Sequence, residues 1–227
     1  MVQDNKQTVQ EPVTLVPSVG SSYGNGWRRL QDYFLELFLI IVIGFIVAIP
    51  VGWFDAAEET RAAGVTLLSV LSLAYGLLLL GPLEYGIAYV NLRAARSDQP
   101  KAGDILEVFK YYADAVLANI LVGAIVCAGL ILLIVPGIVF ACKLAFTPYL
   151  VVDRRMKVID AVKESWRMTD GYAWQVFFIG LLSIPIALAG LICFGVGVIV
   201  SIMWIHLAFA SLYHAVATSG VTATKWS

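Results

Sequence analysis

Three ionisable residues lie inside strongly apolar stretches of this sequence. Glu84 occurs in LLLLGPLEYGIAYV, Lys143 in IVFACKLAFTPYLVV and His206 in VSIMWIHLAFASL. An unpaired charge at the centre of a bilayer costs about 2.5–3.5 kcal/mol even on lenient insertion scales, so such groups should face other helices and find partners. A carboxylate, an ammonium and an imidazole that meet there predict an ion pair, or a relay for protons or a polar substrate.

Composition places these residues in a membrane protein. The 227-residue chain is 60% hydrophobic and 14% charged, with a mean hydropathy of +0.84. A single globular core of this size would not bury so much apolar surface. We therefore expect an all-α integral membrane bundle.

The apolar stretches divide into helical spans of about 20 residues, the length needed to cross roughly 30 Å of hydrocarbon. The sequence predicts a disordered cytoplasmic tail at 1–26, which lacks the apolar region of a secretory signal, and a C-terminal tail at 220–227. Between them, at 27–219, we expect a domain of six transmembrane helices. The predicted spans are 33–54, 65–91, 113–134, 136–152, 173–194 and 197–218.

Proline and glycine mark the expected interruptions of these spans, because proline breaks the helical hydrogen-bond ladder and glycine accepts turn dihedrals. The last four spans form two tight hairpins in this prediction, and a shift of 60 residues aligns several residues of one with the other. The predicted helix breaks are Gly81, Pro82, Pro136, Gly137, Gly195 and Gly197.

A short amphipathic segment precedes each predicted hairpin. The first is GDILEVFKYY, and the second is RRMKVIDAVKESWRMTDG, in which apolar residues recur every three or four positions. Segments of 10–14 residues are too short to cross a bilayer, so we expect two interfacial helices on the cytoplasmic side. The residues expected at headgroup level in the second helix are Lys157, Lys163, Trp166 and Arg167.

Basic residues predict the orientation. With six spans, nearly all lysines and arginines fall on one side, leaving Arg61 alone on the other side and Lys143 inside the membrane. The positive-inside rule makes the basic side cytoplasmic. Both termini are then cytoplasmic in a prokaryotic inner membrane, and the basic loops, largely neutralised by acidic neighbours, favour membrane lipids over nucleic acid as partners.

With this orientation, the distance of each ionisable residue from the cytoplasmic end of its span can be estimated. Glu84 lies about seven residues, roughly 10 Å, from the cytoplasmic end of its span, and Lys143 about ten residues, roughly 15 Å. We expect the two to approach each other directly or through a third polar group, of which His206 is the nearest in depth. Three interpretations remain open: a structural ion pair, a relay through all three residues, or groups that never meet because Lys143 extends to the interface.

Sequence motifs of enzymes are absent. The chain has two histidines and contains no HExxH, no GxSxG, no glycine-rich phosphate loop and no metal-ligand spacing. Its three cysteines, Cys127, Cys142 and Cys193, are isolated in apolar runs. We therefore expect neither enzymatic activity nor a metal or other cofactor.

Several segments, in this order, carry a family resemblance: GPLEYGIAYVNLRAARSDQPKAGDILEVFKYY, LLIVPGI and PYLVVDRRMKVIDAVKESWRMTDGYAW. Over about Gly24 to His214 the chain resembles an uncharacterised prokaryotic multi-pass membrane family related to the membrane domain of some glycerophosphoryl diester phosphodiesterases. The matching elements are a PL-x-x-G element at Pro82, Leu83 and Gly86, a D-x-F-x-x-F-like segment at Asp104–Phe109, PGI at Pro136–Ile138, and VD…A-x-x-x-S-W-x-x-T-x-G at Val152–Gly171.

The resemblance implies a six-span bundle and supplies no catalytic residues, since no phosphodiesterase domain is recognisable in these residues. Two functions stay open. The first is a membrane scaffold or accessory subunit that engages lipids or a protein partner at the cytoplasmic face. The alternative is a small transporter with a polar site at Glu84, Lys143 and His206. The oligomeric state is not predicted.

Overall fold

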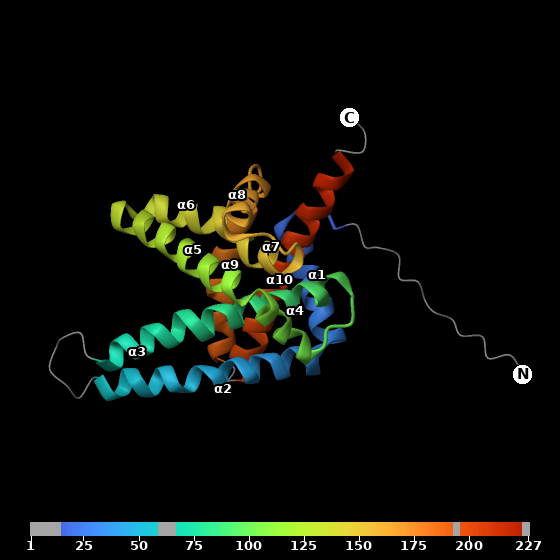
Figure 1. Cartoon of the computed structure of the whole chain (residues 1–227). Helices are drawn as coiled ribbons and strands as arrows, with labels where there is room; N and C mark the ends of the chain where they lie inside the picture. The colour runs from blue at the N-terminus through green and yellow to red at the C-terminus, as the bar shows by residue number, and fades with distance from the viewer. Residues whose placement is uncertain (1–14, 59–66, 193–195, 224–227) are drawn as a thin grey trace, which may run out of the picture.

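The structure is a computed structural model that describes residues 15–58, 67–192 and 196–223, and these residues form helices and turns without a strand (Figure 1). In chain order the elements are α1 (Val19–Asp32), α2 (Phe34–Glu58), α3 (Leu67–Tyr75), the π-helix η1 (Gly76–Leu80), α4 (Gly81–Arg96), the 3₁₀-helix η2 (Ala102–Tyr111), α5 (Tyr112–Leu132), α6 (Ile134–Leu144), α7 (Thr147–Asp153), α8 (Val158–Met168), α9 (Ala173–Ile192) and α10 (Val196–Ala223).

Six of the helical stretches are long and apolar enough to cross a membrane, as the sequence predicts. The all-α class is confirmed for the described residues, and the six stretches fit a multi-pass membrane protein. The stretches are Phe34–Trp53, Leu67–Arg96, Ala102–Leu132, Ile134–Asp153, Ala173–Ile192 and Gly197–Ser219.

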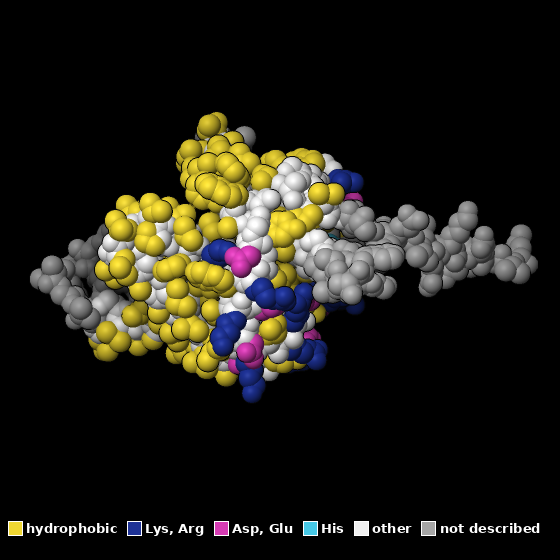
Figure 2. All heavy atoms as spheres, turned by 90° about the horizontal axis from the view of Figure 1, so that it is seen from above, with side chains coloured by type: hydrophobic (Ala, Val, Ile, Leu, Met, Phe, Trp, Pro, Cys, Tyr) yellow, Lys and Arg dark blue, Asp and Glu magenta, His cyan; other side chains and the backbone are white. Residues whose placement is uncertain are grey.

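The helices form three antiparallel pairs around a shared base. The pairs α2–α3, α5–α6 and α9–α10 pack along each other, and in Figure 1 the first two extend away from both chain ends. The base is a buried apolar cluster built from α1, α4, α5, α7, α9 and α10. Figure 2 shows one face of the molecule, on which lysine, arginine and acidic side chains gather in one part beside a broad hydrophobic surface.

The helix α1 corrects the predicted tail at 1–26. Residues 1–14 lie outside the described part of the chain, but α1 starts at Val19, and the Ser18 hydroxyl caps it by accepting a hydrogen bond from the Ser21 amide. Its glycines and serines resemble a loop in composition, yet they allow close packing: a Cβ on Gly26 would lie 3.2 Å from the backbone nitrogen of Ala208 in α10. Small residues promote such close contact between membrane helices.

Polar side chains hold α1 in place from within the helix interface. The Asn25 amide donates to the Ser211 hydroxyl at 2.9 Å and to the Ala95 carbonyl at 3.2 Å. The Tyr23 hydroxyl donates to the Ile179 carbonyl at 2.9 Å. These bonds tie α1 to α4, α9 and α10, so a polar sequence in this position is a structural part of the base.

The predicted breaks of the hairpins are displaced in the structure. The chain reverses at Leu133, which has extended dihedrals, and Pro136 and Gly137 lie in the first turn of α6 instead of in the turn. Proline is compatible with a first helical turn because its missing N–H has no partner there. Gly137 permits hairpin packing, since its added Cβ would lie 2.8 Å from the Leu130 nitrogen.

The α9–α10 hairpin uses glycine in the same way. A Cβ on Gly190 would lie 2.6 Å from the carbonyl oxygen of Gly197, which is the second residue of α10. The predicted break at Gly195 lies outside the described residues.

The first amphipathic segment is the 3₁₀-helix η2, which continues into the apolar stretch of α5. Of the apolar residues on one face of this segment, Ile105 and Val108 are buried against the protein, and Phe109 and Tyr112 are exposed. The segment packs on α4 at Gly86, where an added Cβ would lie 2.4 Å from the Ile105 carbonyl oxygen. Arg93 and Asp104 form an ion pair at 2.5 Å at the start of this contact.

Candidate functional site

Glu84 and His206, two of the three ionisable residues in the apolar stretches, line one cavity. The cavity has a volume of about 350 Å³ and lies between α4, α5, α6, α7 and α10. Asn119 of α5 lines it too, together with the aromatic residues Tyr85, Tyr149 and Phe209. The cavity therefore presents a carboxyl, an amide and an imidazole on a largely apolar wall.

An irregular turn of helix precedes Glu84 in the chain. Pro82 has no N–H to donate to Leu78, four residues earlier, and the helix widens into the π-helix η1 before it. The Tyr112 hydroxyl of α5 donates to the Leu78 carbonyl at 2.8 Å and so replaces the missing bond. Single π turns are frequent at functional sites because they change the direction of side chains.

Gly81 brings Asn119 close to this turn. A Cβ on Gly81 would lie 2.1 Å from the Asn119 amide nitrogen, so only glycine leaves room for the amide in its present place. The predicted break at Gly81 and Pro82 is thus a widened helix supported by two side chains of α5. The sequence did not identify Tyr112 or Asn119 as residues that support this turn, because this role depends on how α5 crosses the α3–α4 stretch.

Lys143 does not join Glu84, and the predicted approach of the two is wrong. Its ammonium forms an ion pair with Asp170, which follows α8, and lies 5.6 Å from the centre of the Trp166 ring. The depth along a span does not define which side of the helix a residue occupies. Lys143 projects toward α8, where a carboxylate and an aromatic face stabilise its charge.

The helix α8 is fastened to the break between α6 and α7. The Ser165 hydroxyl donates to the Lys143 carbonyl at 2.9 Å and accepts from the Phe146 amide at 3.2 Å. The Thr169 hydroxyl also lies within hydrogen-bonding distance of the Lys143 carbonyl, at 3.2 Å. Backbone groups freed where α6 ends are therefore satisfied by side chains of α8.

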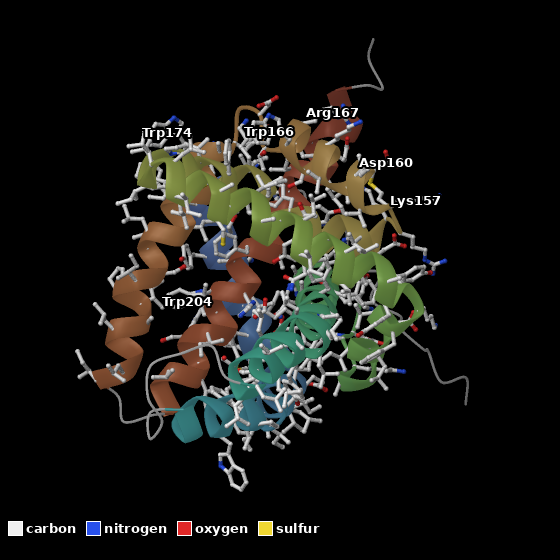
Figure 3. All side chains as sticks on the ribbon, turned by 60° about the vertical axis from the view of Figure 1, so that its left-hand side comes forward. Lys157, Asp160, Trp166, Arg167, Trp174 and Trp204 are labelled. Atoms are coloured by element: carbon white, nitrogen blue, oxygen red, sulfur yellow. The ribbon has the colours of Figure 1, made fainter. Side chains whose placement is uncertain are left out.

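One flank of α8 carries exposed apolar side chains, and the side opposite Ser165 and Thr169 carries the exposed residues Asp160, Lys163 and Arg167. Ile159 is 61% exposed and Trp166 is 40% exposed, although both have large apolar side chains. Figure 3 shows Lys157, Asp160, Trp166 and Arg167 at the same edge of the molecule as Trp174, at the start of α9. This edge combines exposed tryptophans with exposed charges.

Two lysines of this edge are unpaired within the described part of the chain. No carboxylate there forms an ion pair with Lys157 or Lys163, both of which are exposed. Arg167 donates two hydrogen bonds to Glu164, at 2.8 Å each, and thereby lowers the pKa of that carboxyl. Lys157 and Lys163 consequently offer unpaired positive charge on α8 to an anionic partner.

A polar centre that was not predicted joins three helices of the base. Arg96 at the end of α4 donates to both carboxylate oxygens of Asp153 at the end of α7, at 2.6 and 2.8 Å. The Tyr213 hydroxyl of α10 donates to the same carboxylate at 3.1 Å. A bidentate, partly buried pair of this kind is strong and geometrically specific.

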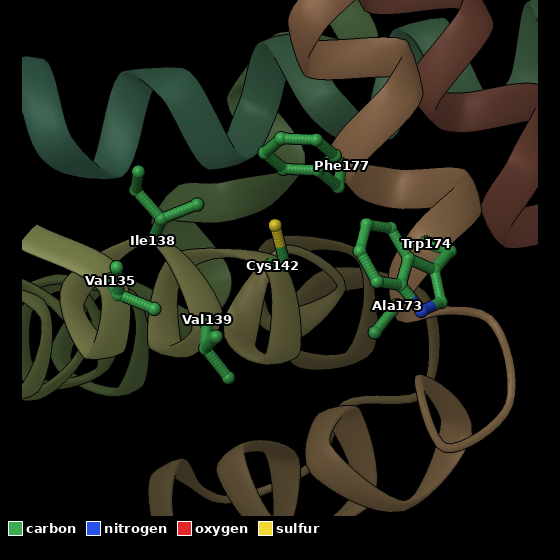
Figure 4. A pocket seen from close by; sticks show the side chains of 7 residues that line it. All are labelled: Val135, Ile138, Val139, Cys142, Ala173, Trp174 and Phe177. Atoms are coloured by element: carbon green, nitrogen blue, oxygen red, sulfur yellow. The ribbon is translucent and has the colours of Figure 1, made fainter.

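A second cavity, of about 440 Å³, lies between α6 and α9 (Figure 4). Its walls are apolar: Ile138 and Cys142 face Phe177, and Ala173 and Trp174 close one end. The Cys142 thiol is the sole sulfur on this wall. Among the described residues, no group of three His, Cys, Asp or Glu side chains is arranged to hold a metal ion.

Comparison with known proteins identifies no relative of this chain. The chain matches no protein-family model, no curated protein and no solved structure.

Proposed function

We propose that the chain is a non-enzymatic integral protein of a prokaryotic cytoplasmic membrane that organises lipids, or a protein partner, at the cytoplasmic face. The exposed face of α8 carries this proposal. Its buried side is fixed to α6 and α7 by Ser165 and Thr169, so the outward position of Ile159 and Trp166 is an enforced feature. A helix with an apolar face, a tryptophan and flanking lysines suits the headgroup region.

If α8 lies at the cytoplasmic surface, the orientation of the whole chain in the membrane follows. The basic residues between the predicted spans, apart from Arg61, would lie with α8 in the cytoplasm, and both termini would lie there as well. Leu106 and Phe109 of η2 are exposed beside Lys110 and would add a second apolar and basic surface. The proposed kinship with the membrane domain of glycerophosphoryl diester phosphodiesterases is compatible with such a role and adds no active site.

Removing the two unpaired lysines should weaken the preference of the protein for anionic lipid. We expect the double substitution Lys157→Gln with Lys163→Gln to reduce the selectivity for phosphatidylglycerol over phosphatidylcholine by roughly 30-fold at most. This figure follows from about 1 kcal/mol for each basic residue near an anionic surface. The measurement is electron spin resonance of spin-labelled lipids around the reconstituted protein.

A matched variant removes the same charge elsewhere. Lys110 is paired with Glu107 at 2.7 Å, and Lys101 lies before η2 outside α8. The double substitution Lys101→Gln with Lys110→Gln should change the lipid selectivity less than the α8 variant. Equal losses in the two variants would mean that overall charge, and not α8, governs lipid preference.

The cavity at Glu84 supports a second candidate function, a small transporter. A titratable carboxyl, an amide and an imidazole share one cavity beside a π turn, an arrangement that transporters use at interrupted helices. Lys143 is outside this cavity, so the candidate site consists of Glu84, Asn119 and His206.

Proton flux through proteoliposomes tests the transporter. If Glu84 carries the proton, Glu84→Gln should lower the flux by about 100-fold or more, as is typical when a proton-transfer group is removed. The control is Lys143→Met, which should leave the flux unchanged because the Lys143 side chain pairs with Asp170 instead of lining the cavity. Full flux in the Glu84→Gln protein, read with an internal pH-sensitive dye, would rule the relay out.

A further inference from the structure

The tip of the α5–α6 hairpin is apolar on all sides. The side chains from Ile131 to Val135 are between 68% and 87% exposed, and no charged residue occurs between Asp114 and Lys143. The region between the apolar parts of α2 and α3 differs, because the stretch DAAEETRAAG, which begins in the last turn of α2, is polar. A connection that emerges into water is expected to be polar, whereas an apolar turn is suited to hydrocarbon.

The helix α6 by itself is too short to cross, because the apolar stretch Ile134–Asp153 reaches 20 residues only together with α7, which is buried in the base. The helix α6 has 11 residues, or about 16 Å, and its end carries the Lys143–Asp170 ion pair. The Trp166 ring of α8 lies 5.8 Å from the Phe140 ring, so only about seven residues, or roughly 10 Å, of α6 extend beyond α8. The hydrocarbon core of a bilayer measures about 30 Å.

The neighbouring helix α9 provides an internal comparison. It starts at Ala173, three residues after Asp170, and therefore leaves from the same ion pair. It has 20 residues, or about 30 Å, and matches the hydrocarbon thickness. The C-terminal end of α6 and the N-terminal end of α9 thus lie at the same polar level. From this level α9 is long enough to reach the far surface, whereas α6 extends at most to about the middle of the bilayer.

The greater length of α5 does not alter this conclusion. Ala115, Val116 and Ala118, in its first half, are buried in the base, where Ala115 and Ala118 belong to one cluster with Leu150 and Val151 of α7. Only the second half of α5 pairs with α6. The two helices touch up to the turn, since a Cβ on Gly129 would lie 2.9 Å from the Gly137 Cα atom.

The geometry points to a re-entrant hairpin: α5 and α6 enter the leaflet that holds α8, turn near the bilayer midplane and contact the acyl chains of that leaflet with the residues from Ile131 to Val135. The cavity between α6 and α9 would hold one acyl chain against Ile138 and Phe177. This inference rests on the proposed headgroup position of α8.

The distribution of basic residues between the two sides of the membrane fits four crossings with a re-entrant hairpin as well as it fits six crossings. Removing two crossings leaves an even number, so every loop except the α5–α6 turn stays on its side of the membrane, and this turn carries no charged residue. Hydropathy and charge therefore cannot distinguish the two arrangements. The lipid contact adds a property that a scaffold of crossing helices lacks, because a wedge in one leaflet displaces lipid there only.

Spin labels at three positions measure the depth of the hairpin in proteoliposomes. Each label is attached to a single cysteine, at Leu133→Cys, Ile192→Cys or Lys163→Cys, in a protein whose native cysteines are replaced by alanine. Depth is obtained from the relative collision rates with oxygen and with a water-soluble nickel complex. All three positions are exposed, so the substitutions remove little packing.

We expect the Leu133 label near the midplane, the Ile192 label at headgroup depth and the Lys163 label at headgroup depth on the other side. A membrane-impermeant maleimide should reach the cysteine at Lys163 from one side, the cysteine at Ile192 from the opposite side, and the cysteine at Leu133 from neither. If Leu133→Cys does not assemble, Ile134→Cys replaces it, since its side chain is equally exposed.

The three labels separate the failure of this inference from that of the proposed function. A Leu133 label at headgroup depth, with labelling from the same side as Ile192, would show that the hairpin crosses and would overturn the re-entrant arrangement alone. A Lys163 label in the hydrocarbon would overturn the headgroup position of α8, and both proposals with it.

Discussion

The substitution Asp153→Ala is expected to destabilise the protein by up to about 3–5 kcal/mol, the loss seen when one partner of a fully buried ion pair is removed, because the Arg96 and Asp153 side chains are only 26% and 14% exposed. Arg96 would lose both of its short hydrogen bonds to the carboxylate, and the Tyr213 hydroxyl would lose its acceptor. The three residues come from α4, α7 and α10, so the loss loosens the base that positions the hairpins. The measurement is the free energy of unfolding in mixed micelles, from titration with a denaturing detergent.

Two variants show whether the ion pair is the cause. Arg29 and Asp32 form a pair at 3.1 Å on one helix in which the Asp32 carboxylate is 53% exposed, and Asp32→Ala should cost less than about 1 kcal/mol because water can solvate this carboxylate. The double substitution Arg96→Met with Asp153→Leu should recover part of the loss, because it leaves no unpaired charge in the base. The explanation fails if Asp153→Ala and Asp32→Ala are equally stable.

The spans and the helical class were predictable because they follow from local properties of the sequence. A helix satisfies its own backbone groups, so a sufficiently long apolar run forms a helix in lipid wherever its neighbours lie. The positions of α2 and α9 illustrate this: the predicted spans 33–54 and 173–194 agree with the observed apolar stretches Phe34–Trp53 and Ala173–Ile192 within two residues at each end.

The partners of the polar residues were not predictable in the same way. The depth of Lys143 in its span follows from the sequence. Its partner does not, because Asp170 lies in a turn whose position depends on how α8 packs against α6. Asn119 looks like an ordinary polar residue in an apolar run, and its place in the cavity becomes evident only when α5 crosses Gly81. Tertiary arrangement decides both cases.

The helix α1 was missed for a different reason. Glycine and serine at 20–24 indicate a disordered segment in isolation, because they contribute little apolar surface. In contact with α10 they allow the backbones to approach, and Asn25 bonds to Ser211 at 2.9 Å across the interface. The same composition therefore means disorder in water and close packing against a second helix.

Two glycine-to-alanine substitutions should have opposite effects on stability. Gly86→Ala places a Cβ 2.4 Å from the Ile105 carbonyl oxygen and 2.9 Å from the Ile105 Cγ1 atom, so η2 must move away from α4. Such overpacking costs typically about 1–3 kcal/mol. Gly123→Ala in α5 meets no atom within 4 Å and should stabilise the helix by about 0.5–1 kcal/mol.

The opposite signs distinguish a specific contact from a general response to lost glycine flexibility. Because η2 also carries Asp104, a shift of η2 should weaken its 2.5 Å ion pair with Arg93, and Gly86→Ala combined with Asp104→Ala should cost less than the sum of the two single changes. Detergent-induced unfolding of the four variants provides the comparison. If Gly86→Ala is as stable as Gly123→Ala, the η2 backbone does not rest on Gly86, and the entry of the chain into α5 must be different.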